Sequence, residues 1–91
     1  MRIKKLAQTG SLESNDLFIM IEPAESGLGI KLEIKSIVQN QYYKRIESVI
    51  LSVLKELQVE DAYIKVQDRG ALDCTIIART ETVIKRAGIA L

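Results

Sequence analysis

The middle of the chain reads Asn40-Gln41-Tyr42-Tyr43-Lys44-Arg45-Ile46-Glu47-Ser48-Val49-Ile50-Leu51-Ser52-Val53-Leu54-Lys55-Glu56-Leu57. Its apolar residues recur at steps of three and four, which places them on one stripe of a helix. Asn40 is suited to cap the helix N-terminus. We therefore predict an amphipathic helix over residues 41–57, about 25 Å long at the standard rise. Burial of its stripe on neighbouring strands is expected to be the main folding event. The stripe consists of Tyr43, Ile46, Val49, Ile50, Val53, Leu54 and Leu57.

Two strands are predicted before this helix. The short apolar run 17–21, bounded by turn residues, is typical of a buried strand. Residues 30–35 alternate between apolar and charged side chains, which is the period of a strand with one face in water. A loop over residues 23–27, which contains the turn-forming residues Pro23 and Gly27, connects the two strands. We expect these two strands to form a hairpin.

Two further strands and a last helix are predicted after the long helix. Residues 62–67 and 72–79 both alternate with a period of two, and a tight turn at residues 68–71 joins them. This reading places Cys74 in the fourth strand as a small buried core side chain. Thr80 is expected to cap a short last helix. One face of that helix would carry Val83, Ile84 and Ala87.

The predicted order of elements is strand-strand-helix-strand-strand-helix. Every apolar face is buried if both helices stack on one face of a mainly antiparallel four-stranded sheet. We therefore predict an α+β fold, with a single small domain over residues 1–91. Residues 1–9 are expected to be a partly ordered lead-in, anchored by Ile3 and Leu6.

The composition argues against several classes of function. Thirteen basic and twelve acidic residues give a net charge of +1, which disfavours binding to nucleic acid or to an anionic membrane. No apolar run approaches the ~20 residues of a membrane span, so we expect a cytoplasmic protein. The chain has no histidine and one cysteine, so the commonest general base is missing and no disulfide or thiolate metal cluster can form within it. We expect a carrier or binding module without a metal site rather than an enzyme.

A polar segment precedes the first strong strand pattern and reads Gly10-Ser11-Leu12-Glu13-Ser14-Asn15-Asp16. Its Gly, Ser, Asn and Asp residues favour a turn. Ser14 has no general base near it in the sequence, so we expect it to be an attachment point used by another enzyme rather than a nucleophile. Glu13 and Asp16 would act as an acid and a base only if the fold brought them together around a substrate.

Three segments resemble the citrate lyase acyl carrier protein family, the gamma subunit of that lyase complex. The segment 10–16 resembles the family's A-G-T-x-E-S-S-D signature. The run from Asp68 to Arg79, DRGALDCTIIAR, resembles D-K-G-A-L-[DE]-C-x-x-x-A-R. Between them, residues 30–33 and 36–38 resemble the family's second strand and helix entry. The matches stay in register over residues 7–87, which is nearly the whole chain.

The resemblance implies that Ser14 carries a phosphoribosyl-dephospho-coenzyme A group through a phosphodiester. The implied partners are an alpha subunit that exchanges acetyl for citrate, a beta subunit that cleaves the citryl thioester, and the transferase that attaches the group. The chain itself would be a non-catalytic tether that presents the substrate at high effective concentration. Glu13 and Asp16 are expected to help these proteins recognise the loop.

Three alternative functions remain open. The related subunit of malonate decarboxylase bears the same kind of group, and the carrier of citramalate lyase would look nearly the same. A small RNA-binding or ligand-binding module has a similar order of elements, but the near-zero net charge, the absence of a G-x-x-G clamp and the lack of an aromatic strand face argue against it. The common phosphopantetheine carriers are helical bundles with a D-S-L motif, which this chain lacks.

Overall fold

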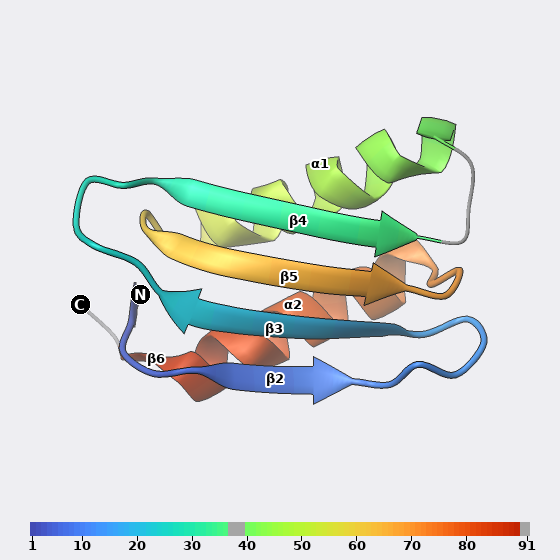
Figure 1. Cartoon of the computed structure of the whole chain (residues 1–91). Helices are drawn as coiled ribbons and strands as arrows, with labels where there is room; N and C mark the ends of the chain where they lie inside the picture. Colours follow the sequence, from blue (N-terminus) through green and yellow to red (C-terminus); the bar gives the residue numbers. More distant parts are fainter. Residues whose placement is uncertain (37–39, 90–91) are drawn as a thin grey trace.

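The computed structural model describes residues 1–36 and 40–89, except for the side chains of residues 40 and 41. The cap predicted for the Asn40 side chain lies outside these described residues. Figure 1 shows the arrangement of the helices and strands along the chain. Their bounds are β1 Arg2–Ile3, β2 Ala7–Gly10, β3 Leu17–Pro23, β4 Ile30–Ser36, α1 Asn40–Glu56, β5 Ala62–Asp68, α2 Asp73–Ala87 and β6 Gly88–Ile89.

The main sheet has four strands in the order β2-β3-β5-β4. Strand β3 is antiparallel to both β2 and β5, whereas β4 is parallel to β5, so the sheet is mixed rather than purely antiparallel. The predicted hairpin between residues 17–21 and 30–35 is wrong, because β5 lies between these strands. Helix α1 carries the chain from the end of β4 back to the start of β5, the crossover that a parallel pair requires.

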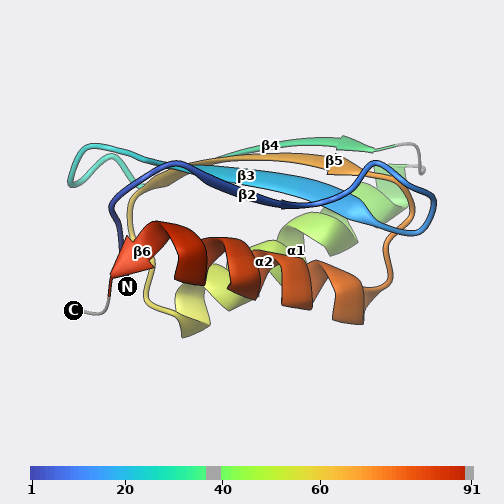
Figure 2. The same ribbon diagram turned by 90° about the horizontal axis from the view of Figure 1, so that it is seen from below.

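Both helices cover the same face of this sheet, as predicted, and they pack against each other beneath it (Figure 2). The side chains of β3 and β5 alternate between buried and less buried positions, so that one face of each strand meets the helices. None of the helices in residues 1–36 and 40–89 is long and apolar enough to cross a membrane. The core between the two layers is built from Leu17, Ile19, Ile21, Ile34, Ile46, Val49, Ile50, Val53, Leu54, Ile64, Val66, Ile76, Val83 and Ile84.

The fourth strand predicted over residues 72–79 is wrong, because helix α2 spans this segment. Thr80, predicted as a helix cap, lies in the buried middle of α2, where its hydroxyl donates to the carbonyl oxygen of Ile76 at 2.7 Å. Cys74 is exposed near the start of α2 rather than buried in the core. The buried positions recur at helical spacing, and they are Ile76, Thr80, Val83, Ile84 and Ala87.

The lead-in predicted over residues 1–9 is replaced by two strands. Strand β2 forms an edge of the main sheet by pairing with β3. Strand β1 pairs antiparallel with β6, which brings the N-terminal segment beside the segment that follows α2 (Figure 1). Ile3 is buried in the core as expected of an anchor, whereas Leu6 is 54% exposed and is not one. The N-terminal segment is therefore an integral part of the fold.

Candidate functional site

The segment 11–16 forms the loop between β2 and β3, at the end of the sheet where β5 ends and α2 begins (Figure 1). The loop is entered through Gly10, which has a φ of +93°. A Cβ atom added at Gly10 would lie 1.9 Å from the carbonyl oxygen of Leu17. Only glycine therefore allows the chain to turn so tightly here.

Two backbone hydrogen bonds attach this loop to the turn that follows β5. The amide of Asn15 donates to the carbonyl oxygen of Arg69 at 2.8 Å, and the amide of Arg69 donates to the carbonyl oxygen of Asp16 at 2.9 Å. Asn15 has a φ of 66°, a left-handed conformation that asparagine tolerates better than most residues. The backbone on the C-terminal side of Ser14 is thus fixed in place.

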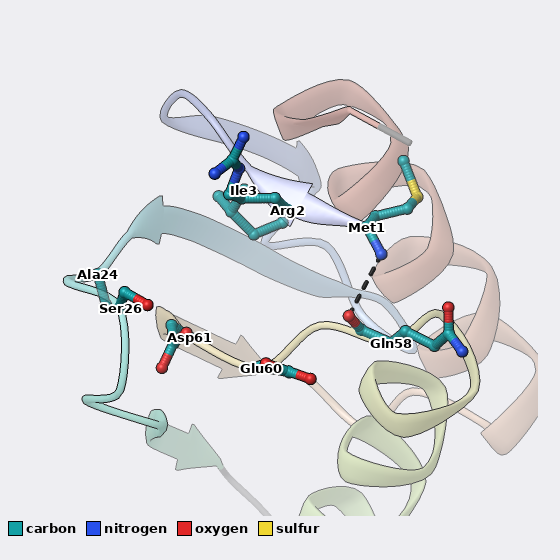
Figure 3. A pocket seen from close by; sticks show the side chains of 8 residues that line it. All are labelled: Met1, Arg2, Ile3, Ala24, Ser26, Gln58, Glu60 and Asp61. Atoms are coloured by element: carbon teal, nitrogen blue, oxygen red, sulfur yellow. Dashed lines mark hydrogen bonds between the residues drawn. The ribbon is translucent and has the colours of Figure 1, made fainter. Parts of the chain in front are cut away.

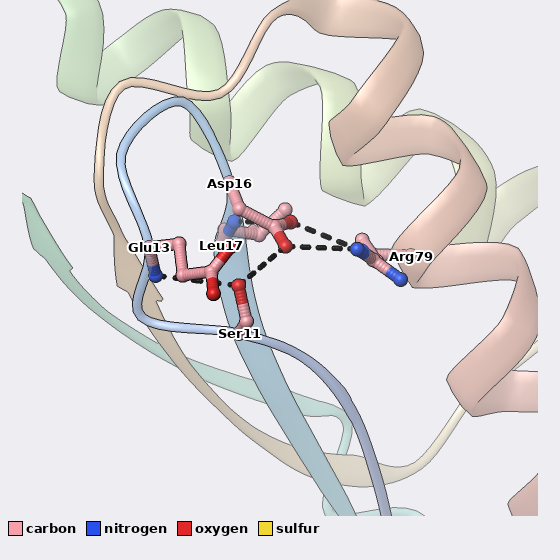
Figure 4. A network of polar contacts seen from close by, with 5 residues as sticks. All are labelled: Ser11, Glu13, Asp16, Leu17 and Arg79. Atoms are coloured by element: carbon pink, nitrogen blue, oxygen red, sulfur yellow. Dashed lines mark hydrogen bonds and ion pairs between the residues drawn. The ribbon is translucent and has the colours of Figure 1, made fainter.

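The carboxylate of Asp16 joins the loop to helix α2 (Figure 4). Arg79 on α2 donates from Nε to Oδ1 at 3.0 Å and from Nη2 to Oδ2 at 2.8 Å. The hydroxyl of Ser11 donates to Oδ2 at 2.7 Å, and the amide of Leu17 donates to Oδ1 at 2.7 Å. A bidentate arginine–carboxylate pair of this kind fixes orientation as well as adding energy. The loop is therefore held at both of its ends.

These donors change the acidity of Asp16. The hydrogen bond from Arg79, above all, lowers the pKa of Asp16 from 3.8 to about 2, with smaller contributions from Ser11 and Leu17 and against an opposing effect of partial burial. The same interaction raises the pKa of Arg79. Asp16 is therefore an ionised anchor at neutral pH and a poor proton acceptor.

The two serines of the loop differ in their surroundings. The hydroxyl of Ser11 is engaged, since it donates to Asp16 and accepts a hydrogen bond from the amide of Glu13 at 3.2 Å. Ser14 is exposed, and its hydroxyl has no hydrogen-bond partner within the described part of the chain. Glu13 is also exposed. The side chains of Ser11 and Asp16 are thus hydrogen-bonded within the protein, whereas those of Glu13 and Ser14 are exposed to solvent.

Arg79 is the part of this site that our reading of the sequence missed. The alternation over residues 72–79 predicts that Arg79 lies opposite the apolar face of a strand, and the family-like run includes it only as its last residue. In the structure it reaches a carboxylate 63 positions away in the sequence. A helical reading of residues 73–87 would have placed Arg79 beside the buried stripe, but no pattern in one sequence identifies its partner.

The turn after β5 is built around a buried carboxylate. Asp68 is 2% exposed and accepts hydrogen bonds at 3.0 Å from the amides of Gly70 and Ala71. It also accepts one from the hydroxyl of Ser36, at the end of β4, at 2.9 Å. The tight turn predicted at residues 68–71 is present, although it leads into a helix. It supports the loop that carries Ser14.

Two hollows lie at opposite ends of the domain. One, of about 200 Å³, lies between α1, the turn after β5 and the start of α2, close to the Ser14 loop. The other, of about 190 Å³, lies at the end where β3 finishes, and the amino group of Met1 donates there to the carbonyl oxygen of Gln58 at 3.2 Å (Figure 3). Among the described residues, no group of three or more His, Cys, Asp or Glu side chains is placed to hold a metal ion.

Comparison with known proteins identifies the family. A family model described as "Malonate decarboxylase delta subunit (MdcD)" matches residues 4–87. Proteins named citrate lyase acyl carrier protein match over 87 residues, 96% of this chain. The one from Streptococcus equi subsp. equi is 48% identical, with 84% of its length covered, and the one from Fusobacterium nucleatum is 45% identical, with 92% covered. The chain belongs to the citrate lyase acyl carrier protein family. The resemblance predicted from the three segments is confirmed.

A solved structure supports the fold of this acyl carrier family member. One chain in the crystal structure of a Pseudomonas malonate decarboxylase hetero-tetramer in complex with malonate superimposes with a TM-score of 0.75, at 20% sequence identity. The match covers 93% of this chain and 86% of that chain. At this low identity the likeness concerns the fold: a small α+β domain with two helices and mixed sheets. Its relatives are carrier proteins, so the chain is a non-catalytic carrier by family.

Proposed function

We propose that this chain is the carrier subunit of a citrate lyase, and that Ser14 holds a phosphoribosyl-dephospho-coenzyme A group through a phosphodiester. The single observation that carries the choice of Ser14 is its exposed hydroxyl, without a hydrogen-bond partner in the described residues, on a loop that is otherwise fixed. Ser11 is a poorer candidate because its hydroxyl stabilises the loop. The proposed place of action is the cytoplasm.

In this proposal the attached group supplies a terminal thiol on which acetyl and citryl thioesters are carried. The residues of this chain hold the attachment site in a fixed position for the proteins that act on it. Asp16 and Arg79 keep the loop in one shape, so that a transferase meets the same surface at every encounter. Glu13, which is exposed beside Ser14, is the carboxylate that remains available for recognition by the transferase or the partner subunits.

The partners in this proposal are the acyl-exchanging alpha subunit, the citryl-cleaving beta subunit and the transferase that modifies Ser14. The names of the relatives support the lyase. The family model and the similar fold in a malonate decarboxylase support the related carrier of that enzyme as the second candidate. A carrier of citramalate lyase would share the same loop. The mass of the acyl group on the native protein distinguishes a citryl from a malonyl carrier, whereas an acetyl group fits both because loss of CO2 from a malonyl thioester leaves an acetyl thioester.

The attachment site is tested by intact mass measurement and peptide mapping of protein produced together with its transferase. We expect the mass increment of the group on the peptide that contains Ser14, and its loss in Ser14→Ala. Ser48→Ala removes another exposed hydroxyl, on α1, and is the matched control that should keep the increment. An increment that persists in Ser14→Ala, or that is absent from the wild-type protein, would overturn the proposal.

A further inference from the structure

The hollow near the Ser14 loop has the features of a resting site for a flexible, mostly apolar arm. Its volume is about 200 Å³, and it is formed by the first half of α1, the turn after β5 and the start of α2. Its floor includes Ile46 and Ile76, which belong to the core. We call it the α1–α2 cleft. Its lining residues are Tyr42, Arg45, Ile46, Asp68, Gly70, Ala71, Leu72, Asp73 and Ile76.

The rim of the α1–α2 cleft carries large apolar side chains that the isolated chain leaves in water. Leu72 is 69% exposed and Tyr42 is 54% exposed, and both line the cleft. Arg45 and Asp73 form an exposed ion pair on the same rim and offer polar groups beside the apolar surface. A ligand with methyl groups and amides would match this combination.

The α1–α2 cleft is also within reach of Ser14. The amides of Asn15 and Arg69 tie the Ser14 loop directly to the turn after β5. Leu72, on the rim of the cleft, is three residues after Arg69. At most about 11 Å of chain therefore separates the contact between Arg69 and the Ser14 loop from the cleft. A group joined to Ser14 is therefore held at a high local concentration next to the cleft.

The arginine side chains near the Ser14 loop and the α1–α2 cleft include one that suits a phosphate-containing group. Arg79 and Arg45 are each paired with a carboxylate. Arg69, whose backbone contacts the loop, has an exposed side chain that forms no ion pair within the described residues. Its guanidinium is thus available to phosphate oxygens.

We infer that the group on Ser14 folds back over the turn after β5 and rests its pantetheine end in the α1–α2 cleft. This inference rests on the proposed function, since it needs the attached group. In the docked state the cleft shields the terminal thiol and its thioester from water. A partner subunit then has to draw the arm out of the cleft before it can react.

The first test compares methyl-group NMR spectra of the modified protein with those of the unmodified protein. We expect signals of Ile46, Leu72 and Ile76 to shift on modification, in addition to those of the loop. Shifts confined to residues 11–16 would overturn the inference. Cleft signals that move only after a partner subunit is added would also overturn it, by identifying the cleft as a docking surface for that subunit.

The second test measures how fast an alkylating reagent modifies the terminal thiol. The background is Cys74→Ser, because Cys74 is exposed and would compete for the reagent. Leu72→Asp should raise the alkylation rate about fivefold, because it shifts the population from the docked to the free arm. The matched control is Leu28→Asp, an exposed leucine at the far end of the sheet, which should leave the rate unchanged. Equal rates in all three proteins would overturn the inference.

The two proposals fail in different ways. If mass measurement finds no group on Ser14, the proposed function fails and the inference fails with it. If the group is present on Ser14 and neither the NMR spectra nor the alkylation rates respond, only the docking of the arm is overturned.

Discussion

The loops at the two ends of β3 are of similar length but are built differently. The loop over residues 11–16 is tied to the turn after β5 by two backbone hydrogen bonds and to α2 by the ion pair between Asp16 and Arg79. The loop over residues 24–29 is attached through Gly29, whose amide donates to Asp61 Oδ1 at 2.8 Å and whose carbonyl oxygen accepts from the amide of Ala62 at 3.2 Å. The loop over residues 11–16 therefore has one defined shape. Ser14 is held in place by the contacts of Asn15 and Asp16 rather than by contacts of its own side chain.

The glycines show the same difference at the atomic scale. A Cβ atom at Gly10 would collide with the backbone at Leu17, whereas one at Gly27 would meet nothing within 4 Å. Both residues have a positive φ, so the difference lies in their surroundings. The Ser14 loop therefore depends on tertiary packing, and the opposite loop depends mainly on local conformation.

The largest expected effect comes from exchanging these glycines for alanine. Gly10→Ala should lower the free energy of unfolding by about 3 kcal/mol or more, because it adds a backbone collision to an unfavourable φ. Gly27→Ala should lower the free energy of unfolding by only about 1–2 kcal/mol, because it places an alanine at a positive φ without a collision. Urea unfolding of both variants measures the difference. Equal losses would show that the two loops are built alike.

A smaller effect is expected from the ion pair that fixes the loop. A double-mutant cycle with Asp16→Asn and Arg79→Gln should give a coupling energy of about 1–2 kcal/mol, reduced from the full range for charged hydrogen bonds because Arg79 is 39% exposed. The matched cycle uses Arg45→Gln and Asp73→Asn, whose side chains are 62% and 45% exposed. We expect a smaller coupling there. A larger value for the second pair would contradict the anchoring role of Asp16.

The smallest effect is expected in the dependence of stability on pH. The pKa of Asp16 is about 2 in the folded protein, below its ordinary value of 3.8, so its contribution is complete above pH 4 and is lost as the pH falls towards 2. The stability advantage of the wild-type protein over Asp16→Asn should therefore shrink between about pH 4 and pH 2. Urea midpoints of both proteins across this range provide the measurement. A constant difference would mean that Asp16 is not held by Arg79 in solution.

Part of this fold could be predicted from the sequence because its patterns are strong and local. The stripe from Tyr43 to Leu57 predicts α1, the apolar run at residues 17–21 predicts β3, and the alternation at residues 30–35 and 62–67 predicts β4 and β5. The partners of these strands could not be predicted in the same way. A pattern in one strand shows which face is buried, but not which strand lies beside it.

The errors also have identifiable causes. Leu72, Cys74, Ile76 and Ala78 alternate as a strand would, and the buried Thr80 interrupts the apolar stripe that would have indicated a helix. Strand β2 has little apolar character, so the residues that pair it with β3 gave no signal. The serine loop was predicted from its own residues and from family likeness, whereas its anchor Arg79 depends on an ion pair between distant segments.

The pairing of β1 with β6 has a practical consequence. It places residues 2–3 and 88–89 at one end of a domain whose longest dimension is 35 Å, and the Ser14 loop lies at the other end (Figure 1). A fluorescent label, an affinity tag or a surface anchor on either terminus is therefore separated from the loop by the length of the sheet. Immobilised in this way, the domain would present the Ser14 loop outward, away from the support.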